Sequence, residues 1–125
     1  MNDTLQELLD RRAFLVLSTL NPDGAPQSSV IWGKHDDGDV VFSTIRGRRK
    51  TLNMERDPRV SICVYDPANP YRYVEVRGTV TLTEEDGPAL IDDLSRAYVG
   101  QPWAEPDPDS VRVVCRVSAT KYTEH

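Results

Sequence analysis

The sequence predicts a mainly β fold in which six antiparallel strands form one small barrel, with two or three short helices, in a single domain over residues 1–125. Three observations predict it. Short β-rich runs alternate with turn signals, and most connections between them have hairpin length. Few stretches show helical spacing, fewer than the crossover helices of a parallel sheet require. The length of 125 residues and the apolar content of 38% suffice for one core.

The N-terminal half predicts one helix followed by an antiparallel meander. Leu5, Leu8 and Leu9 recur at helical spacing, so we expect a short amphipathic helix that covers an open end of the sheet. The sequence Asn-Pro-Asp-Gly at 21–24 is a strong turn signal between the first two strands. The expected elements are a helix at residues 4–12, strands at 14–19, 26–32 and 40–44, and polar turns at 21–24 and 35–39.

The C-terminal half predicts a short basic helix, three more strands and a second amphipathic helix. An apolar stripe that includes Leu90 and Leu94 marks the amphipathic helix, and Thr83 with Asp86 resembles a capping box at its start. Gly78 predicts a β-bulge in the long strand before it. The expected elements are helices at 47–56 and 83–99, strands at 60–65, 71–82 and 111–118, and loops at 66–70 and 102–108.

Composition excludes several classes of function. A net charge of −5 argues against general binding of nucleic acid, whose phosphates need a basic surface. The apolar runs are much shorter than a membrane span, and the N-terminus has no signal-peptide pattern, so we expect a cytoplasmic protein. Cys63 and Cys115 lie in apolar strands and are expected to be buried thiols. His35 and His125 are too isolated for a metal site or a catalytic triad, so no metal is expected.

The most informative segment is a cluster of basic residues. Six of the fifteen lysines and arginines fall between positions 46 and 59. The cluster follows a strand that ends in Ser43 and Thr44, and a glycine turn leads from there into the basic helix. Hydroxyl groups, early-helix N–H groups and cationic side chains are the parts that bind phosphate. From the residues alone, an anion site and a solvated basic turn both stay open.

Residues 40–61 resemble the cofactor-phosphate segment of the pyridoxamine 5′-phosphate oxidase-like superfamily, the FMN-binding split β-barrel proteins. The segment at 66–78 and the hairpin at 14–26 are similar to its branch of small deazaflavin (coenzyme F420)-dependent reductases, and the likeness spans most of residues 5–120. The resemblance implies a split barrel of Greek-key type that works as a homodimer, with the cofactor at the subunit interface. Because the chain ends soon after its last strand, oxidation of vitamin B6 is not expected.

The resemblance also implies a set of cofactor-binding residues. Ser43 and Thr44 would contact the phosphate or the ribityl chain, and some of the three adjacent cations would bind the phosphate and the acidic tail of a deazaflavin. The second strand would line the ring, although Val30 and Ile31 are equally compatible with barrel packing, and Trp32 with an interface anchor. The complete set is Ser28, Ser29, Val30, Ile31, Trp32, Ser43, Thr44, Arg48, Arg49 and Lys50.

The implied reaction is hydride transfer between coenzyme F420 and a small organic substrate, without an assigned catalytic residue. Tyr71 and Tyr73 are candidate proton donors, but aromatic residues are also favoured in strands for packing alone. Two alternatives stay open at this stage. One is an FMN-dependent reductase or oxidase on the same scaffold, and the other is a flavin- or deazaflavin-binding protein without catalytic activity.

Overall fold

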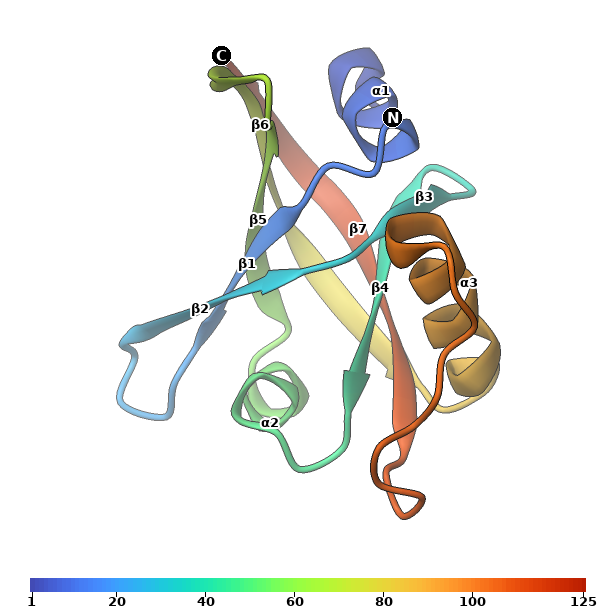
Figure 1. Cartoon of the computed structure of the whole chain (residues 1–125). Helices are drawn as coiled ribbons and strands as arrows, with labels where there is room; N and C mark the ends of the chain where they lie inside the picture. Colours follow the sequence, from blue (N-terminus) through green and yellow to red (C-terminus); the bar gives the residue numbers. More distant parts are fainter.

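The computed structural model describes residues 1–125 and has one antiparallel sheet of seven strands (Figure 1). The order of strands across the sheet is β2-β1-β5-β6-β7-β4-β3. Along the chain the strands are β1 (Leu15–Leu20), β2 (Pro26–Ile31), β3 (Lys34–Asp36), β4 (Asp39–Ile45), β5 (Arg59–Asp66), β6 (Asn69–Thr83) and β7 (Arg112–Glu124). The long strands β6 and β7 pair along most of their length and lie in the middle of the sheet.

The sheet curls into a barrel because its two edge strands are consecutive in the chain. Only Trp32 and Gly33 separate β2 from β3. Gly33 lies so close to its neighbours that a Cβ atom there would stand 2.7 Å from a methyl group of Leu15. The backbone N–H of Gly33 donates to the Tyr98 hydroxyl at 3.2 Å, and this hydroxyl lies 2.6 Å from the carbonyl oxygen of Ala13. Tyr98 therefore holds the connection between β2 and β3 in place, where the barrel closes.

Three helices surround the barrel, α1 (Asp3–Asp10), α2 (Arg49–Arg56) and α3 (Gly87–Val99). Figure 1 shows α1 and α2 at opposite ends of the barrel and α3 along its side, where it packs on β4 and β7. The Asn2 side chain caps α1 by accepting a hydrogen bond from the backbone N–H of Leu5. None of the three helices has the length and hydrophobicity needed to cross a membrane.

The apolar core fills the barrel interior. Its buried residues come from every long strand, from the apolar stripe of α1 and from Met54 of α2. Strand β5 shows the underlying pattern, because Val60, Ile62 and Val64 are buried while the residues between them face outward. A second, smaller cluster joins Leu90 and Leu94 of α3 to the outer surface of the sheet. The barrel interior is thus filled by side chains, so a ligand of cofactor size must bind outside it.

The predicted fold class is confirmed, with differences at particular elements. A short seventh strand, β3, lies where a polar turn was expected, because residues 34–36 pair with β4. The predicted capping box is wrong: Thr83 belongs to β6, α3 begins at Gly87, and Asp86 makes no side-chain cap. The predicted bulge is confirmed as a register shift between Arg77 and Gly78.

The two cysteines differ in their surroundings. Cys115 is buried as predicted, and burial raises the pKa of its thiol to about 12. Cys63 is a free thiol on the outer face of β5 and is only partly buried, so the prediction of a core thiol is wrong at this position. Neither cysteine forms a disulfide.

Candidate functional site

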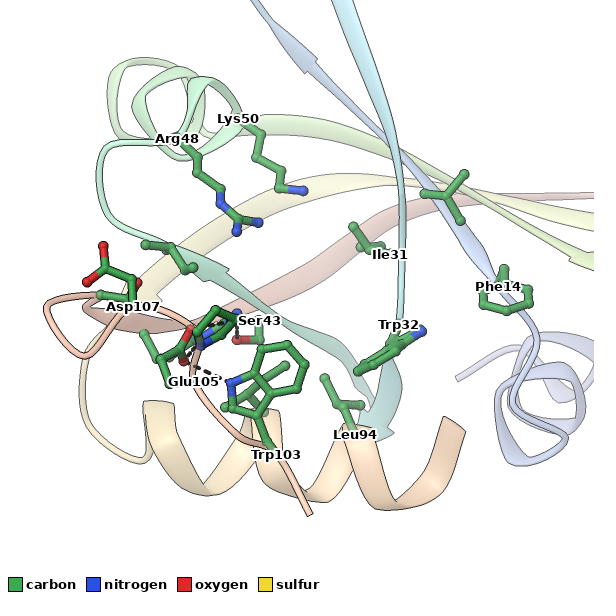
Figure 2. A pocket seen from close by; sticks show the side chains of 16 residues that line it. Phe14, Ile31, Trp32, Ser43, Arg48, Lys50, Leu94, Trp103, Glu105 and Asp107 are labelled. Atoms are coloured by element: carbon green, nitrogen blue, oxygen red, sulfur yellow. Dashed lines mark hydrogen bonds and ion pairs between the residues drawn. The ribbon is translucent and has the colours of Figure 1, made fainter. Parts of the chain in front are cut away.

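A pocket of about 340 Å³ lies outside the barrel, between β2, β4, the start of α2 and the loop that joins α3 to β7 (Figure 2). Phe14 and the residues at the end of β2 form one side, and the loop before β7 forms another. In Figure 2, Arg48 and Lys50 lie at one end of the pocket, and Trp103 and Trp32 lie at the other. The lining residues are Phe14, Val30, Ile31, Trp32, Ser43, Ile45, Arg48, Lys50, Ile91, Leu94, Trp103, Glu105, Pro106, Asp107, Ser110 and Arg112.

Three consecutive positive side chains stand at the start of α2, two of them lining the cationic end of the pocket and one, Arg49, exposed beside it. Arg48, Arg49 and Lys50 form no ion pair, whereas thirteen contacts between a lysine or arginine and a carboxylate occur elsewhere in the molecule. The neighbouring Arg46 is held by Glu55 and Glu84, at 3.0 and 3.2 Å. The first N–H groups of a helix also lack intrahelical acceptors, and no side chain caps α2. Although the protein is acidic overall, the hydrogen-bond donors and positive charges at the start of α2 therefore have no acidic side chain paired with them.

Lys50 is the most deeply placed of these cations. Its ammonium group donates one long hydrogen bond, of 3.4 Å, to the hydroxyl oxygen of Ser29. Burial and the nearby Arg48 guanidinium lower the pKa of Lys50 below its ordinary value. A half-buried cation without an acidic partner is unfavourable in the isolated chain, and an anion in the pocket would relieve this cost.

The other end of the pocket contains a fully paired network. The Arg112 guanidinium donates two hydrogen bonds to the Glu105 carboxylate, at 2.8 and 3.1 Å, and a longer one of 3.4 Å to the Ser43 hydroxyl. The indole N–H of Trp103 donates to the same carboxylate at 2.9 Å. These hydrogen bonds, the ones from Arg112 first, lower the pKa of Glu105 and keep it ionised.

The loop that carries Trp103 is tied to α3 at two points. The backbone N–H of Trp103 donates to the Asp92 carboxylate at 2.8 Å, and the Ser95 hydroxyl donates to the carbonyl oxygen of Gln101 at 2.8 Å. Arg112 lies over the Trp103 ring, with its central carbon 4.9 Å from the ring centroid. The loop therefore forms a fixed wall of the pocket.

The structure brings six of the ten predicted cofactor-binding residues to this pocket. They are Val30, Ile31, Trp32, Ser43, Arg48 and Lys50. Ser29 does not line it but contacts Lys50, and Arg49 is exposed at the start of α2 beside it. Ser28 points to the outer face of the sheet, where its hydroxyl lies 3.1 Å from that of Ser18.

Thr44 is placed away from the pocket, because alternate residues of β4 face opposite sides. Its hydroxyl is buried and lies 2.9 Å from the Thr51 hydroxyl, which itself donates to the carbonyl oxygen of Ile45 at 2.6 Å. Thr44 therefore ties β4 to α2, and its side chain is not available to a ligand in the pocket. The predicted contact of Thr44 with the cofactor does not fit this arrangement.

Several lining residues were not among the predicted site residues. The proline-rich loop was expected only to influence specificity, without any residue assigned to a role. Trp103, Glu105 and Arg112 form the network described above, and Ile91 and Leu94 come from α3. An aromatic residue and a carboxylate within a proline-rich loop is the only local signal that would have indicated them. Tyr71, a candidate proton donor, is 87% exposed and does not line this pocket, and Tyr73 stacks on His125.

Comparison with known families matches the whole chain, residues 1–125, to the family described as pyridoxamine 5′-phosphate oxidase. The chain belongs to this family. A pyridoxine/pyridoxamine 5′-phosphate oxidase of Rubrobacter xylanophilus is 37% identical over 73 residues. These residues are 58% of this chain but only 33% of that protein, so the match covers about a third of the relative.

Solved structures of other proteins are similar over nearly the whole chain. A structure described as an F420 reductase is 35% identical, with a TM-score of 0.84 and 94% of each chain covered. A conserved hypothetical protein of Mycobacterium tuberculosis has a TM-score of 0.80 and 24% identity, over 99% of this chain and 84% of that one, which supports the fold alone. The predicted resemblance, to this superfamily and to its F420 reductase branch, is therefore confirmed.

Proposed function

We propose that this protein is a coenzyme F420-dependent oxidoreductase that transfers a hydride between the deazaflavin and a small organic substrate. The observation that carries the proposal is the group of unpaired cations at the start of α2, in a protein of net charge −5, at one end of a pocket with aromatic walls. The 35% identity to a structure described as an F420 reductase supports a deazaflavin.

The chemistry of the donor set fits an anionic cofactor. Arg48 and Lys50 would hold its negatively charged groups, with Arg49 available to the acidic tail outside the pocket. Val30 and Ile31 would provide the apolar side for the ring. When bound, the cofactor supplies the hydride chemistry, and the protein supplies orientation and a partly desolvated site.

A second candidate is an FMN-dependent oxidase or reductase. The family description and the relative from Rubrobacter xylanophilus, both named for pyridoxamine 5′-phosphate oxidase, favour this alternative. FMN carries one phosphate, which the same cations would bind, whereas the deazaflavin adds an acidic tail. Purified protein with tightly bound yellow FMN, or turnover of pyridoxamine 5′-phosphate, would support this second candidate.

The deciding experiment is a parallel fluorescence titration of the protein with FMN and with coenzyme F420. We expect tighter binding of F420, because its additional negative charges meet cations that have no other partner. Replacing Arg48 and Lys50 together with alanine should weaken binding at least about tenfold, since a hydrogen bond to a charged group contributes about 1.5–3 kcal/mol. The residual binding should depend less on salt concentration, because fewer charged contacts are left to be screened.

The matched control is the double variant Arg11→Ala/Lys34→Ala. It also removes two positive charges, but from side chains that are 62% and 43% exposed and lie outside the pocket. If it weakens binding as much as the Arg48/Lys50 variant, the effect comes from net charge alone and the proposed anion site is wrong. Unchanged affinity and an unchanged salt dependence in the Arg48/Lys50 variant would also contradict the proposal.

We further propose that a second copy of the chain completes the site. On the outer face of the sheet, Val30 of β2 is 65% exposed and pairs with Val16 of β1, which pairs with Cys63 of β5. These three side chains form an apolar row that continues into the pocket, since Val30 and Phe14 also line it. A partner on this row would bury the exposed apolar area and cover the open side of the pocket.

Sedimentation equilibrium tests the homodimer. We expect a dimer for the unmodified chain and a monomer for Val30→Asp, because a carboxylate buried without a partner disfavours the interface. Val99→Asp is the control, since Val99 is also an exposed apolar residue, at the end of α3 and outside this row. A monomeric unmodified chain, or dissociation by both variants alike, would refute the proposed interface.

A further inference from the structure

Trp103 is held in a fixed orientation by contacts that do not depend on a ligand. Its indole N–H donates to Glu105 at 2.9 Å, its backbone N–H donates to Asp92 at 2.8 Å, and Arg112 covers one face of the ring. The Arg112 side chain is only 8% exposed, although it carries a full charge. So many polar contacts to one partly exposed aromatic ring indicate that its orientation matters for function.

The fixed indole forms a corner with a second tryptophan inside the pocket. Trp32 and Trp103 meet nearly at right angles, with an angle of 89° between their planes and 6.2 Å between their centroids. Trp32 is supported from behind by the stacked ring of Tyr98, at 5.6 Å and 14°. A flat ring that enters this corner stacks on one indole and meets the other edge to face, the two arrangements that aromatic rings prefer.

We infer that Trp103 contacts the substrate and that the substrate is a neutral, flat, conjugated ring compound. This inference rests on the proposed function and names the substrate class of the same site. Two observations separate this position from the cofactor's anionic groups. The corner lies at the opposite end of the pocket from Arg48 and Lys50 (Figure 2), and the cation and carboxylate beside it, Arg112 and Glu105, are already paired with each other. An anionic substrate would find no unpaired cation there, and a saturated one would lose the stacking.

Glu105 acts through Trp103 as a positioning residue. Its carboxylate accepts hydrogen bonds from the indole N–H and from the Arg112 guanidinium. The orientation of the Trp103 ring and the position of Arg112 over it therefore both depend on Glu105. Replacing it should therefore affect a flat ligand only as long as Trp103 is present. This dependence separates a positioning role from a general loss of structure.

The experiment is a calorimetric titration with a matched pair of uncharged, unreactive probes, 2-naphthamide and its saturated analogue decahydronaphthalene-2-carboxamide. The unmodified protein should bind the flat probe and prefer it to the saturated one. Trp103→Leu should raise the Kd of 2-naphthamide about 3- to 10-fold, the range expected for one aromatic pair, and change that of the saturated probe by less than about twofold. Trp103→Phe, which keeps an aromatic face, should restore most of the affinity.

Glu105→Ala should weaken 2-naphthamide in the same direction, and the double variant Glu105→Ala/Trp103→Leu should bind no more weakly than Trp103→Leu alone. Glu105→Gln keeps an acceptor for the indole and serves if Glu105→Ala does not fold. Equal weakening of both probes by Trp103→Leu, an unchanged Kd in this variant, or no binding of 2-naphthamide to the unmodified protein would each overturn the assignment.

Titrations with and without saturating coenzyme F420 separate this inference from the proposed function. If 2-naphthamide binds equally well in both, and Trp103→Leu leaves the affinity for F420 unchanged, Trp103 belongs to the substrate site. If F420 displaces 2-naphthamide, the corner receives the cofactor ring and the inference is wrong. If F420 does not bind at all, the proposed function fails, whereas the probe titrations without cofactor still decide whether Trp103 binds a flat ring.

Discussion

Positive side chains are unpaired at one end of the pocket and paired with a carboxylate at the other. At the start of α2, Arg48 and Lys50 line the pocket without any acidic partner. At the start of β7, Arg112 is nearly buried, and both Glu105 oxygens accept its hydrogen bonds. Since a paired charge has its partner within the fold and an unpaired one does not, the first end is suited to bind a ligand and the second to hold side chains in place.

The largest expected effect separates the two ends by stability. Arg112→Ala should lower the free energy of unfolding by about 2–3 kcal/mol, because it leaves the Glu105 carboxylate without its main partner in a partly buried place. Arg48→Ala should change it by less than about 0.5 kcal/mol, as is usual for an unpaired surface residue. Urea denaturation measures both. Similar losses for the two variants would break the distinction between a paired and an unpaired end.

The second expected effect concerns pH and the cationic end. Burial lowers the pKa of Lys50 in the free protein, and a bound anion would raise it again. Affinity for the anionic cofactor should therefore be complete below the lowered pKa and decline as the pH rises from the pKa of the free protein to that of the complex. The loss should reach about tenfold, the amount expected for one charge-assisted hydrogen bond of about 1.5 kcal/mol.

Lys50→Arg provides the control for this pH dependence, because a guanidinium stays charged throughout the alkaline range. Titrations of F420 at a series of alkaline pH values should show a decline for the unmodified protein and a flatter profile for Lys50→Arg. Arg11→Lys places a new titratable ammonium on an exposed residue outside the pocket and should leave the decline as it is. Parallel declines in the unmodified protein and in Lys50→Arg would show that another group titrates.

The same contrast explains what the sequence made predictable. The cationic end is built from consecutive residues, since Ile45 to Lys50 includes the end of one strand, a glycine turn and the start of a helix. Local signals of this kind are visible in the sequence, as were the hairpin at 21–24 and the bulge at Gly78. The face of the sheet to which each side chain points was less predictable, because it depends on the register of the strand. Ser43 and Thr44 are adjacent, yet only Ser43 lines the pocket.

The paired end was not predictable in the same way, because tertiary contacts create it. Trp103 is placed by Asp92 of α3, and Arg112 by the pairing of β7 with β4. The start of α3 has a similar cause: Gly87 packs so tightly on β7 that a Cβ atom there would lie 2.3 Å from the carbonyl oxygen of Arg112. A capping signal at Thr83 could not compete with this contact. Strand β3 was missed because its three residues carry no alternation of apolar side chains.

The smallest expected effect has the opposite sign to the first. Lys50→Met should raise the free energy of unfolding by up to about 1 kcal/mol, although it removes a charge from the proposed cofactor site. The lowered pKa of Lys50 means that the unfolded chain holds this proton more firmly than the folded one, so the charged form opposes folding below its ordinary pKa. The gain should shrink as the pH rises through the lowered pKa and the penalty disappears. Urea denaturation at neutral and alkaline pH measures this difference. A loss of stability in Lys50→Met at neutral pH would mean that the ammonium has a structural partner, and the cationic end would then resemble the paired one.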